Sequence, residues 1–271
     1  MLPPPSAAPE EGSAVCSFTS GDVSFRVGIS EDRNRRCRRV MEDTHSVEMN
    51  YCGVPGQGFF GVFDGHGGRT AAEWCGEHFH KTLKGCLEDN QGKEPVPEVL
   101  KQAFLAADAR LAENKQDHSG CTVITALLTR KLYTANVGDA RAVLCRGGKA
   151  IRMSYDHKGT DQRESQRITD KGGFMMGNRV NGMLAVTRAL GDTAMKEFVI
   201  GLPYTQEVDL CEDDTFLILA CDGLWDVCDD QTAIDLIKNI ANPHEASQKL
   251  MKYALDNFSS DNLTIMVIRF S

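Results

Sequence analysis

The sequence predicts an α+β fold in which two mainly antiparallel β-sheets form a central sandwich and helices pack on its outer faces. Nine short runs of apolar and β-branched residues are typical of strands. Several are joined by turns such as TRK and RGGK, which favour antiparallel hairpins. Helical spacing appears between the runs without the strict alternation of strand and helix that marks a parallel α/β fold.

The expected strands come from the apolar runs, taken in order. They lie at about residues 22–29, 43–51, 58–63, 121–129, 131–137, 141–146, 206–210, 215–221 and 263–270.

The expected helices come from apolar residues spaced three or four positions apart. One stripe is formed by Leu100, Phe104, Ala107 and Leu111. Another is formed by Ala246, Leu250, Tyr253 and Asn257, of which the first three have largely apolar side chains. We also expect a helix that starts near Gly68 and one over residues 229–241.

The chain of 271 residues is long enough to bury a large core, and we expect one domain over residues 19–271. Four of the nine prolines fall within the first nine residues, so residues 1–18 are interpreted as a flexible N-terminal lead-in. Residues 155–185, rich in charge and in Gly, Asn and Met, interrupt the strands. They predict an inserted flap with one short helix.

Charge and cysteine content narrow the function classes. Thirty Lys and Arg against 38 Asp and Glu give a net charge of −8, so we expect neither nucleic acid nor membrane as a partner. The ten cysteines form no CxxC pair and are interpreted as reduced thiols. We expect an intracellular monomer, located in the cytoplasm and also in the nucleus.

Acidic residues mark the places where predicted strands surface. They are Glu42, Asp43, Asp64, Asp139, Asp222 and Asp261. Carboxylates gathered at one end of a sheet repel one another and lose hydration, so they need a cation or raised pKa values. Oxygen ligands without the Cys/His spacing of a zinc site favour Mg²⁺ or Mn²⁺.

Each of these features also has an ordinary structural explanation. The segment FDG at Asp64 is typical of a hairpin turn, and the pair Glu42 and Asp43 is typical of a solvated surface. His66 alone is as typical of a surface or capping histidine as of a catalytic one. The five arginines of RNRRCRRV, residues 33–40, are mostly expected in a solvated loop, although one beside an acidic metal site could bind a phosphate. The recurrence of acidic residues at strand ends favours a functional site.

The motifs together resemble the metal-dependent type 2C family of Ser/Thr protein phosphatases. They occur in order as RRVMEDTH, FFGVFDGHGG, SGCTVITALL, ANVGDARAVL, VNGMLAVTRALGD, LACDGLWDV and SSDNLTIMV, and the resemblance covers residues 20–271. It implies a phosphatase catalytic domain with two Mg²⁺ or Mn²⁺ ions at one end of the sandwich. It also implies that the substrates are phosphorylated proteins, and the small members it is most similar to suggest a MAP kinase or its upstream kinases.

The resemblance assigns most of the acidic residues to metal ions. It implies ligands, direct or through water, at Glu42, Asp64, Asp222 and Asp261 and at the carbonyl of Gly65. A weaker third ion would lie at Asp139 and Asp226.

The same resemblance implies roles for five other residues. Asp43 would orient water, Arg38 would bind the substrate phosphate, and His66 would be the general acid. Thr122 and Asn262 would stand behind the ligands.

The implied reaction is attack on phosphorus by a hydroxide that bridges the two metals, with no covalent phosphoenzyme. Two positions depart from the family pattern: Gly159 stands where proline is common, and Ala140 where serine is common. Both leave the expected ligands in place, although Gly159 bears on substrate docking.

Three other functions compete with that of a type 2C phosphatase. A cysteine phosphatase is excluded, because none of the ten cysteines has an arginine six positions later. A catalytically inactive scaffold that binds a kinase or adaptor would be expected to have lost metal carboxylates, yet every expected position is filled. A metal-dependent phosphodiesterase or nuclease has little support, because the sequence shows no pattern of basic and aromatic residues that would form a nucleic-acid groove.

Overall fold

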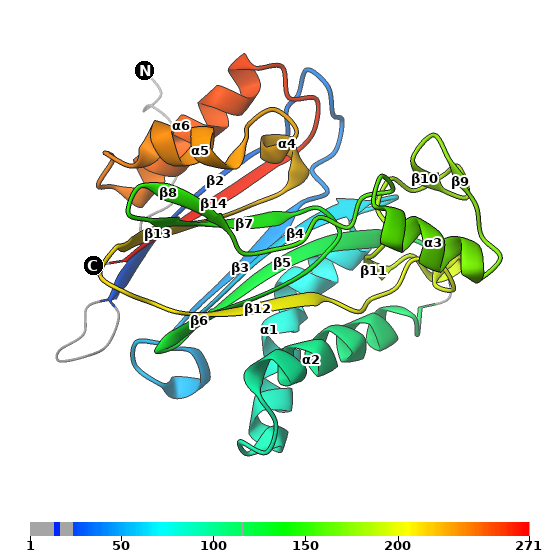
Figure 1. Ribbon diagram of the computed structural model, residues 1–271, viewed down its shortest axis with the longest axis horizontal. Coiled ribbons are helices and arrows are strands. Elements are labelled where there is room, and N and C mark those ends of the chain that lie inside the picture. The colour runs from blue at the N-terminus through cyan, green and yellow to red at the C-terminus, as the bar shows by residue number, and fades with distance from the viewer. Residues whose placement is uncertain (1–13, 17–23, 115, 271) are drawn as a thin grey trace, which may run out of the picture.

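Two antiparallel sheets pack face to face, and helices cover the outer face of each (Figure 1). The computed structural model describes residues 14–16, 24–114 and 116–270. This architecture confirms the predicted α+β sandwich. No helix in these described segments combines the length and apolar character needed to cross a membrane.

The first sheet has the strand order β1, β2, β14, β13, β7, β8. Its strands are β1 (Ala14–Cys16), β2 (Phe25–Asp32), β14 (Leu263–Phe270), β13 (Asp214–Ala220), β7 (Arg141–Arg146) and β8 (Lys149–Arg152). Every neighbouring pair is antiparallel. β14 occupies an interior position between β2 and β13, so segments from both ends of the sequence meet in the middle of the sheet.

The second sheet has the order β12, β6, β5, β4, β3, with β11 paired to β5. Its strands are β12 (Tyr204–Asp209), β6 (Lys131–Val137), β5 (Gly120–Leu128), β4 (Gly58–His66), β3 (Thr44–Met49) and β11 (Leu190–Gly191). All of these pairs are antiparallel as well.

The helices divide between the two sheets (Figure 1). α1 (Thr70–Asn90) and α2 (Val96–Leu111) cover the second sheet. α4 (Asp222–Trp225), α5 (Asp230–Ile237) and α6 (Pro243–Asp256) cover the first. Two short 3-10 helices lie at Tyr51–Gly53 and Thr193–Met195.

Strand β4 shows why the run that contains it is apolar without alternation. Phe59 and Phe63 face the helix layer, where each ring centroid lies 6.0 Å from that of Phe79. Phe60 faces the other sheet and meets Phe25 edge to face at 5.4 Å. Both faces of the strand are buried, and such strands are expected as near-continuous apolar runs.

The predicted flap contains helix α3 (Gln162–Asp170) and a small hairpin of β9 (Met175–Met176) and β10 (Arg179–Val180). Ile168 of α3, Val180 of β10 and Val199 form a small apolar core of their own. The helix starts at Asp161, whose side chain accepts hydrogen bonds from two backbone N–H groups of the first turn. The flap is therefore a folded, packed insertion on the sandwich.

The lead-in predicted at residues 1–18 lies mostly outside the described residues, and its flexibility stays a prediction. Within it, residues 14–16 form β1, which pairs with β2.

Candidate metal centre and active site

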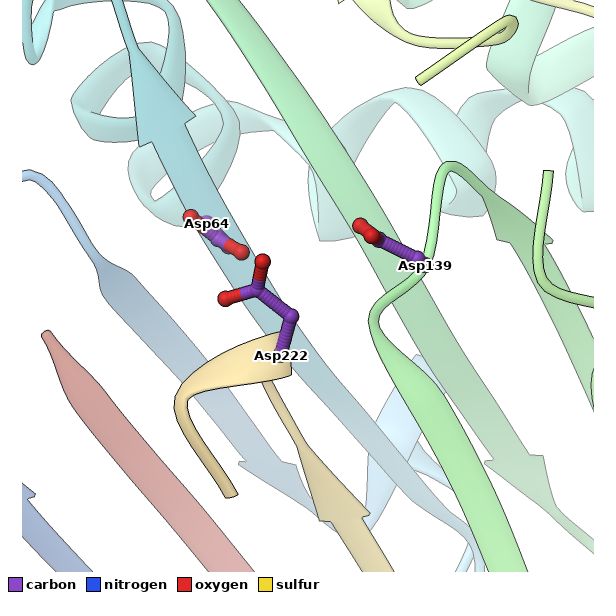
Figure 2. A group of neighbouring side chains, drawn as sticks. All are labelled: Asp64, Asp139 and Asp222. Carbon is purple, nitrogen blue, oxygen red and sulfur yellow. The ribbon is translucent and has the colours of Figure 1, made fainter. Parts of the chain in front are cut away.

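Three aspartates meet at one end of the sandwich. Asp64 is near the end of β4, Asp139 follows β6, and Asp222 begins α4 after β13. Each offers a carboxylate oxygen, and these three oxygens lie within 4.8 Å of one another (Figure 2). The antiparallel strands thus bring acidic residues from distant parts of the sequence together, as their positions at strand ends predicted.

A glycine turn lets Asp139 reach this cluster. Gly138 has a φ of 84°, and a Cβ atom there would lie 2.4 Å from the Cβ of Thr122. Thr122 is buried opposite Asp64 in the register of β4 and β5, and its hydroxyl has no hydrogen-bond partner among the described residues. A side chain at position 138 would therefore force the turn away from β5 and carry Asp139 with it.

The cluster concentrates negative charge. Loss of hydration and the charges of Asp222 and Asp43 raise the pKa of Asp64 well above its usual range. Loss of hydration and the charges of Asp139 and Asp261 raise the pKa of Asp222 in the same way. Carboxylates in such surroundings either bind protons or face a cation.

Asp43 is buried beside the cluster. Burial raises the pKa of its carboxyl to about 6, against the lowering effect of the Thr264 hydroxyl. Its Oδ2 atom has no hydrogen-bond partner among the described residues. A buried, unpaired carboxylate oxygen next to three converging carboxylates fits a site built for a hard cation and its water.

Glu42 and Gly65 lie beside the approach to α1. The Glu42 carboxylate accepts a hydrogen bond from the N–H of Gly68 at 2.9 Å. A Cβ atom at Gly65 would lie 2.5 Å from the carbonyl oxygen of Glu42, so this close approach of two backbone segments requires glycine.

Asn262 holds in place the loop that carries Arg38, the residue predicted to bind the substrate phosphate. Its Oδ1 accepts from the N–H of Glu42 at 2.9 Å, and its Nδ2 donates to the carbonyls of Arg33 and Val40 at 2.9 and 3.0 Å. The loop thus uses three of the four hydrogen-bonding positions of the amide, and one lone pair of Oδ1 is left over. Asn262 therefore positions the loop against the start of β14.

Arg38 lies at the rim of the cluster. Its guanidinium forms an ion pair with Asp261, and its Nε donates to the carbonyl of Ser260 at 3.2 Å. The two paired side chains are 42% and 31% exposed. A guanidinium in this position can turn toward an incoming phosphate without leaving a buried charge behind.

His66 has a partner that the sequence interpretation missed. Its Nε2 lies 2.8 and 3.0 Å from the two carboxylate oxygens of Asp192, which is buried and has a φ of 47°. A Cβ atom at Gly120 would lie 2.2 Å from an Asp192 oxygen, so glycine at that position makes room for the pair. The only sequence signal was the aspartate that ends RALGD.

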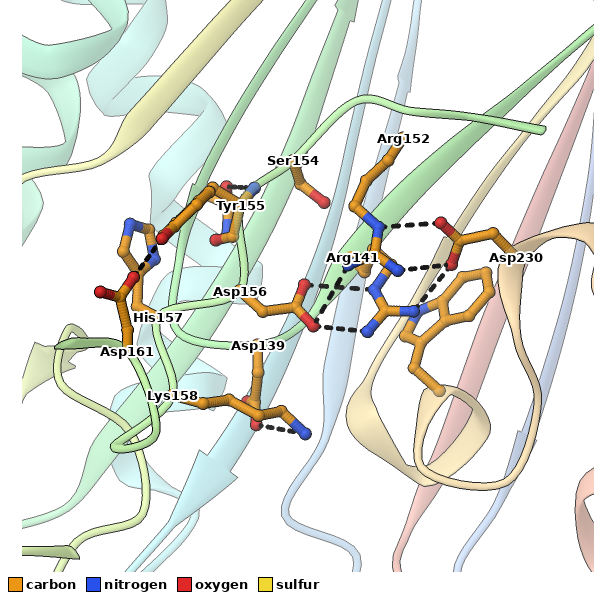
Figure 3. Close-up of polar contacts among 12 residues, drawn as sticks. Asp139, Arg141, Arg152, Ser154, Tyr155, Asp156, His157, Lys158, Asp161 and Asp230 are labelled. Atoms are coloured by element: carbon orange, nitrogen blue, oxygen red, sulfur yellow. Dashed lines mark hydrogen bonds and ion pairs between the residues drawn. The ribbon is translucent and has the colours of Figure 1, made fainter. Parts of the chain in front are cut away.

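Asp139 and Asp226, the predicted third metal position, share Lys158. Its Nζ lies 3.4 Å from Asp139 Oδ2 (Figure 3) and 2.8 Å from Asp226 Oδ1. Burial acts against the charge of Lys158, but the contacts with Asp226 and Asp139 outweigh it and raise the pKa of the lysine to about 12. This ammonium group is a resident cation at the edge of the cluster, and the sequence interpretation missed it too.

Behind Asp139 the acidic residues are fully matched by arginines. Arg141 donates to Asp156 at 3.1 Å and to Asp230 at 2.7 Å (Figure 3). Its guanidinium also lies 5.1 Å from the ring centroid of Trp225. Arg152 binds Asp230 as well, at 2.8 Å. The charges of Asp156 and Asp230 are therefore offset by arginines, unlike those of Asp64 and Asp222.

The two departures from the family pattern have structural counterparts. A Cβ atom at Gly159 would lie 1.8 Å from the carbonyl oxygen of Asn178, so the turn of the flap hairpin closes against a residue without a side chain. Ala140 is fully buried between the two sheets, where a methyl group fits.

Comparisons with known proteins agree with this geometry. Residues 27–263 match the family described as protein phosphatase 2C. The chain is 45% identical to protein phosphatase 2C homolog 1 of Saccharomyces cerevisiae, over 92% of this chain and 95% of the relative. It is also 45% identical to protein phosphatase 2C homolog 1 of Schizosaccharomyces pombe, over 92% of this chain and 74% of the relative.

The fold likeness extends to solved structures. A serine-threonine phosphatase 2C from Toxoplasma gondii superposes with a TM-score of 0.77 at 23% identity, over 97% of this chain and all of that one. The chain therefore belongs to the protein phosphatase 2C family. Membership makes it an enzyme of the protein serine/threonine phosphatase class, a family that depends on metal ions.

Proposed function

We propose that the protein hydrolyses phosphoserine and phosphothreonine in proteins, with two Mg²⁺ or Mn²⁺ ions held at the acidic end of the sandwich. The observation that carries this proposal is the convergence of oxygens from Asp64, Asp139 and Asp222 within 4.8 Å of one another. Their surroundings disfavour the ionised forms unless a cation is present.

The donor set fits hard cations. Asp64 and Asp222 would hold the ions together with Asp261, Glu42 and the carbonyl of Gly65, and all of these donors are oxygen atoms. When bound, the ions would supply an acidified water as nucleophile and positive charge for the phosphoryl group. A weaker third ion would compete with Lys158 for Asp139 and Asp226.

The protein's own groups would bind and orient the reactants. Arg38 would bind two phosphate oxygens through its planar guanidinium, and release of Asp261 would free that carboxylate for a cation. The unpaired oxygen of Asp43 would accept a hydrogen bond from the attacking water.

Departure of the product alcohol needs a proton. As the bond from phosphorus to the serine or threonine oxygen breaks, the electron pair stays on that oxygen, and His66 would donate its proton there. Asp192 would hold the ring in position. Water supplies the new oxygen on phosphorus.

A phosphate-release assay tests the proposal. The protein is incubated with a phosphothreonine peptide, a nucleotide diester and single-stranded DNA, first with EDTA and then with Mg²⁺ or Mn²⁺ added. We expect turnover of the phosphopeptide alone, and only with the metal. Equal release in EDTA, or faster cleavage of the diester or the DNA, would contradict the proposal.

A wider proposal rests on the family resemblance alone. The substrates would be phosphoproteins of kinase signalling in the cytoplasm and nucleus, MAP kinases or their upstream kinases among them. The phosphatase would lower the signal by removing their phosphates.

A further inference from the structure

A wide groove adjoins the active site on the side of the first sheet. It has a volume of about 1350 Å³ and lies between the end of β2, the loop of residues 33–37, helix α6 and the segment Phe258–Ser259. In Figure 1 the blue loop after β2 runs beside the red end of α6. We call it the arginine groove, after Arg33, Arg35 and Arg36, which line it.

The charges in the arginine groove do not cancel. Glu31 lies 2.7 Å from His45 and Asp256 binds Lys252 at 2.8 Å, whereas Asp32 accepts only the neutral N–H of Asn34 at 2.6 Å and keeps its negative charge.

The arginines of the groove, in contrast, lack such partners. Within the described segments no carboxylate pairs with Arg35 or Arg36, and both are exposed. Arg33 has a buried Nε atom with no hydrogen-bond partner there. The groove is therefore lined by four cationic side chains, Arg33, Arg35, Arg36 and Lys252, against three carboxylates, Glu31, Asp32 and Asp256, although the whole chain has a net charge of −8.

Phe258 adds an exposed apolar surface to the rim of the groove. It is 90% exposed and has a φ of 63°, a left-handed conformation that favours glycine or asparagine at the end of a helix. A bulky residue in this conformation is strained, and at 90% exposure it gains nothing from packing. Exposed aromatic and arginine side chains together are typical of the residues that dominate binding energy at protein interfaces.

The groove is joined to the phosphate site by short contacts. Asn34, which lines the groove, donates its side-chain amide to the carbonyl of Ser259 at 2.6 Å and accepts the N–H of Arg38 at 2.9 Å. Arg36 is only two residues from Arg38, which is at most about 7 Å of chain. A peptide whose phosphate lies at Arg38 can therefore place neighbouring residues in the groove.

We propose that the arginine groove binds an acidic segment of the phosphoprotein substrate, with a large apolar side chain of that segment against Phe258. This inference rests on the proposed function, because it makes the groove part of substrate selection. Charge complementarity carries it: the guanidinium groups of Arg35 and Arg36 are exposed, have no carboxylate partner in the described segments, and match carboxylates of a substrate.

The experiment uses two phosphothreonine peptides that differ only beside the phosphate. One carries Glu residues and a Leu within about five residues of the phosphothreonine, a span of roughly 17 Å when extended, and the other carries Gln and Ser instead. The enzyme variants are Arg35→Glu with Arg36→Glu, and Phe258→Asn, because asparagine tolerates the left-handed backbone. The matched control is Arg130→Glu with Lys149→Glu, two exposed positions, one just after β5 and one at the start of β8.

We expect the wild type to prefer the acidic peptide in kcat/KM, and the double arginine variant to lose about tenfold on that peptide, or about 1.4 kcal/mol. Turnover of para-nitrophenyl phosphate, which cannot reach the groove, should stay within about twofold for this variant, and the control should keep the preference. Phe258→Asn removes the apolar contact and should lower kcat/KM for the acidic peptide but not for the Gln and Ser peptide. A wild type that does not distinguish the peptides would overturn the proposal.

Binding measured by fluorescence anisotropy with the unphosphorylated acidic peptide separates the two proposals. No turnover of either phosphopeptide would reject the proposed function, whereas equal anisotropy for the wild type and the double arginine variant would reject the groove. Binding of phosphatidylserine vesicles without binding of the acidic peptide would also overturn the proposal, in favour of a membrane contact.

Discussion

Two parts of the molecule bury carboxylates and stabilise them in opposite ways. In the flap, Glu164 is buried between Arg167, at 3.0 Å, and Arg188, at 2.6 Å, and these two arginines lower its pKa to about 2 in spite of its burial. At the end of the sandwich, Asp64 and Asp222 face other carboxylates, and their pKa values are raised.

The comparison shows which charge serves the fold and which serves a ligand. Glu164 receives its positive charge from the chain itself, so it ties α3 to the segment that leads into β11. Among the described residues, the aspartate cluster has Lys158 beside Asp139 at one edge and Arg38 beside Asp261 at the other, and neither forms an ion pair with Asp64 or Asp222, so folding alone leaves it repulsive. A carboxylate cluster that weakens the fold is expected where a cation will bind.

The largest expected effect is on the cluster. Asp222→Asn should lower phosphopeptide turnover by at least about a hundredfold, since even residues behind metal ligands cost 10–100-fold when changed. In EDTA the same variant should unfold at a higher temperature than the wild type, because one repulsive charge is gone. Thermal unfolding with and without Mn²⁺ checks both signs.

The control for this change is Asp209→Asn, at an aspartate whose side chain is 80% exposed. It should change neither turnover nor unfolding. A lower unfolding temperature for Asp222→Asn in EDTA would contradict the idea that the cluster is repulsive.

Removing the buried carboxylate of the flap should destabilise the fold, opposite to the effect of Asp222→Asn in EDTA. Glu164→Gln leaves two arginines without their shared carboxylate and should lower the free energy of unfolding by about 3–5 kcal/mol. Because the folded pKa lies below that of the unfolded chain, the contribution is complete above about pH 4.5 and is lost as the pH falls toward 2. Urea unfolding at several pH values measures this difference, and a difference that grows below pH 4 would contradict it.

A third carboxylate, Asp192, sharpens the comparison because its partner is the predicted general acid. Asp192→Asn should lower kcat for a phosphothreonine peptide by about 10–100-fold. With para-nitrophenyl phosphate, whose leaving group needs little protonation, the loss should be small. Equal losses on both substrates would assign Asp192 to the fold and not to the position of His66.

The smallest expected effect is a shift of unfolding temperature with pH. In EDTA, lowering the pH from about 7.5 to about 5.5 should raise the unfolding temperature, by about 2–4 °C for each 1 kcal/mol. The raised pKa of Asp43, about 6, and those of Asp64 and Asp222 mean that the folded state binds more protons than the unfolded chain, so stability falls as the pH rises. With saturating Mn²⁺ this slope should flatten, and differential scanning fluorimetry can measure it.

The sequence was most informative where a local residue pattern decides the structure. Apolar runs located β4, β5 and β14, and the aspartates at strand ends located the cluster, since antiparallel strands return to the same end. The short β8 was missed, because its four residues are partly exposed at the edge of the sheet and carry no apolar pattern.

Pairings between distant side chains could not be predicted. Asp192 and His66 are separated by 126 positions, and Arg38 and Asp261 by 223. Which carboxylate each basic group meets depends on how the flap and the loop pack, and a single sequence gives no signal for that. The roles assigned to the individual site residues likewise stay predictions until variants are assayed.

The interior place of β14 affects how the enzyme is made. Asp261 and Asn262 stand at its start, and the strand fills the gap between β2 and β13. While the ribosome is still adding this strand, the first sheet is incomplete and the loop of residues 33–40 lacks its hydrogen bonds to Asn262. Each newly synthesised molecule should therefore be inactive toward phosphoproteins until β14 has left the ribosome.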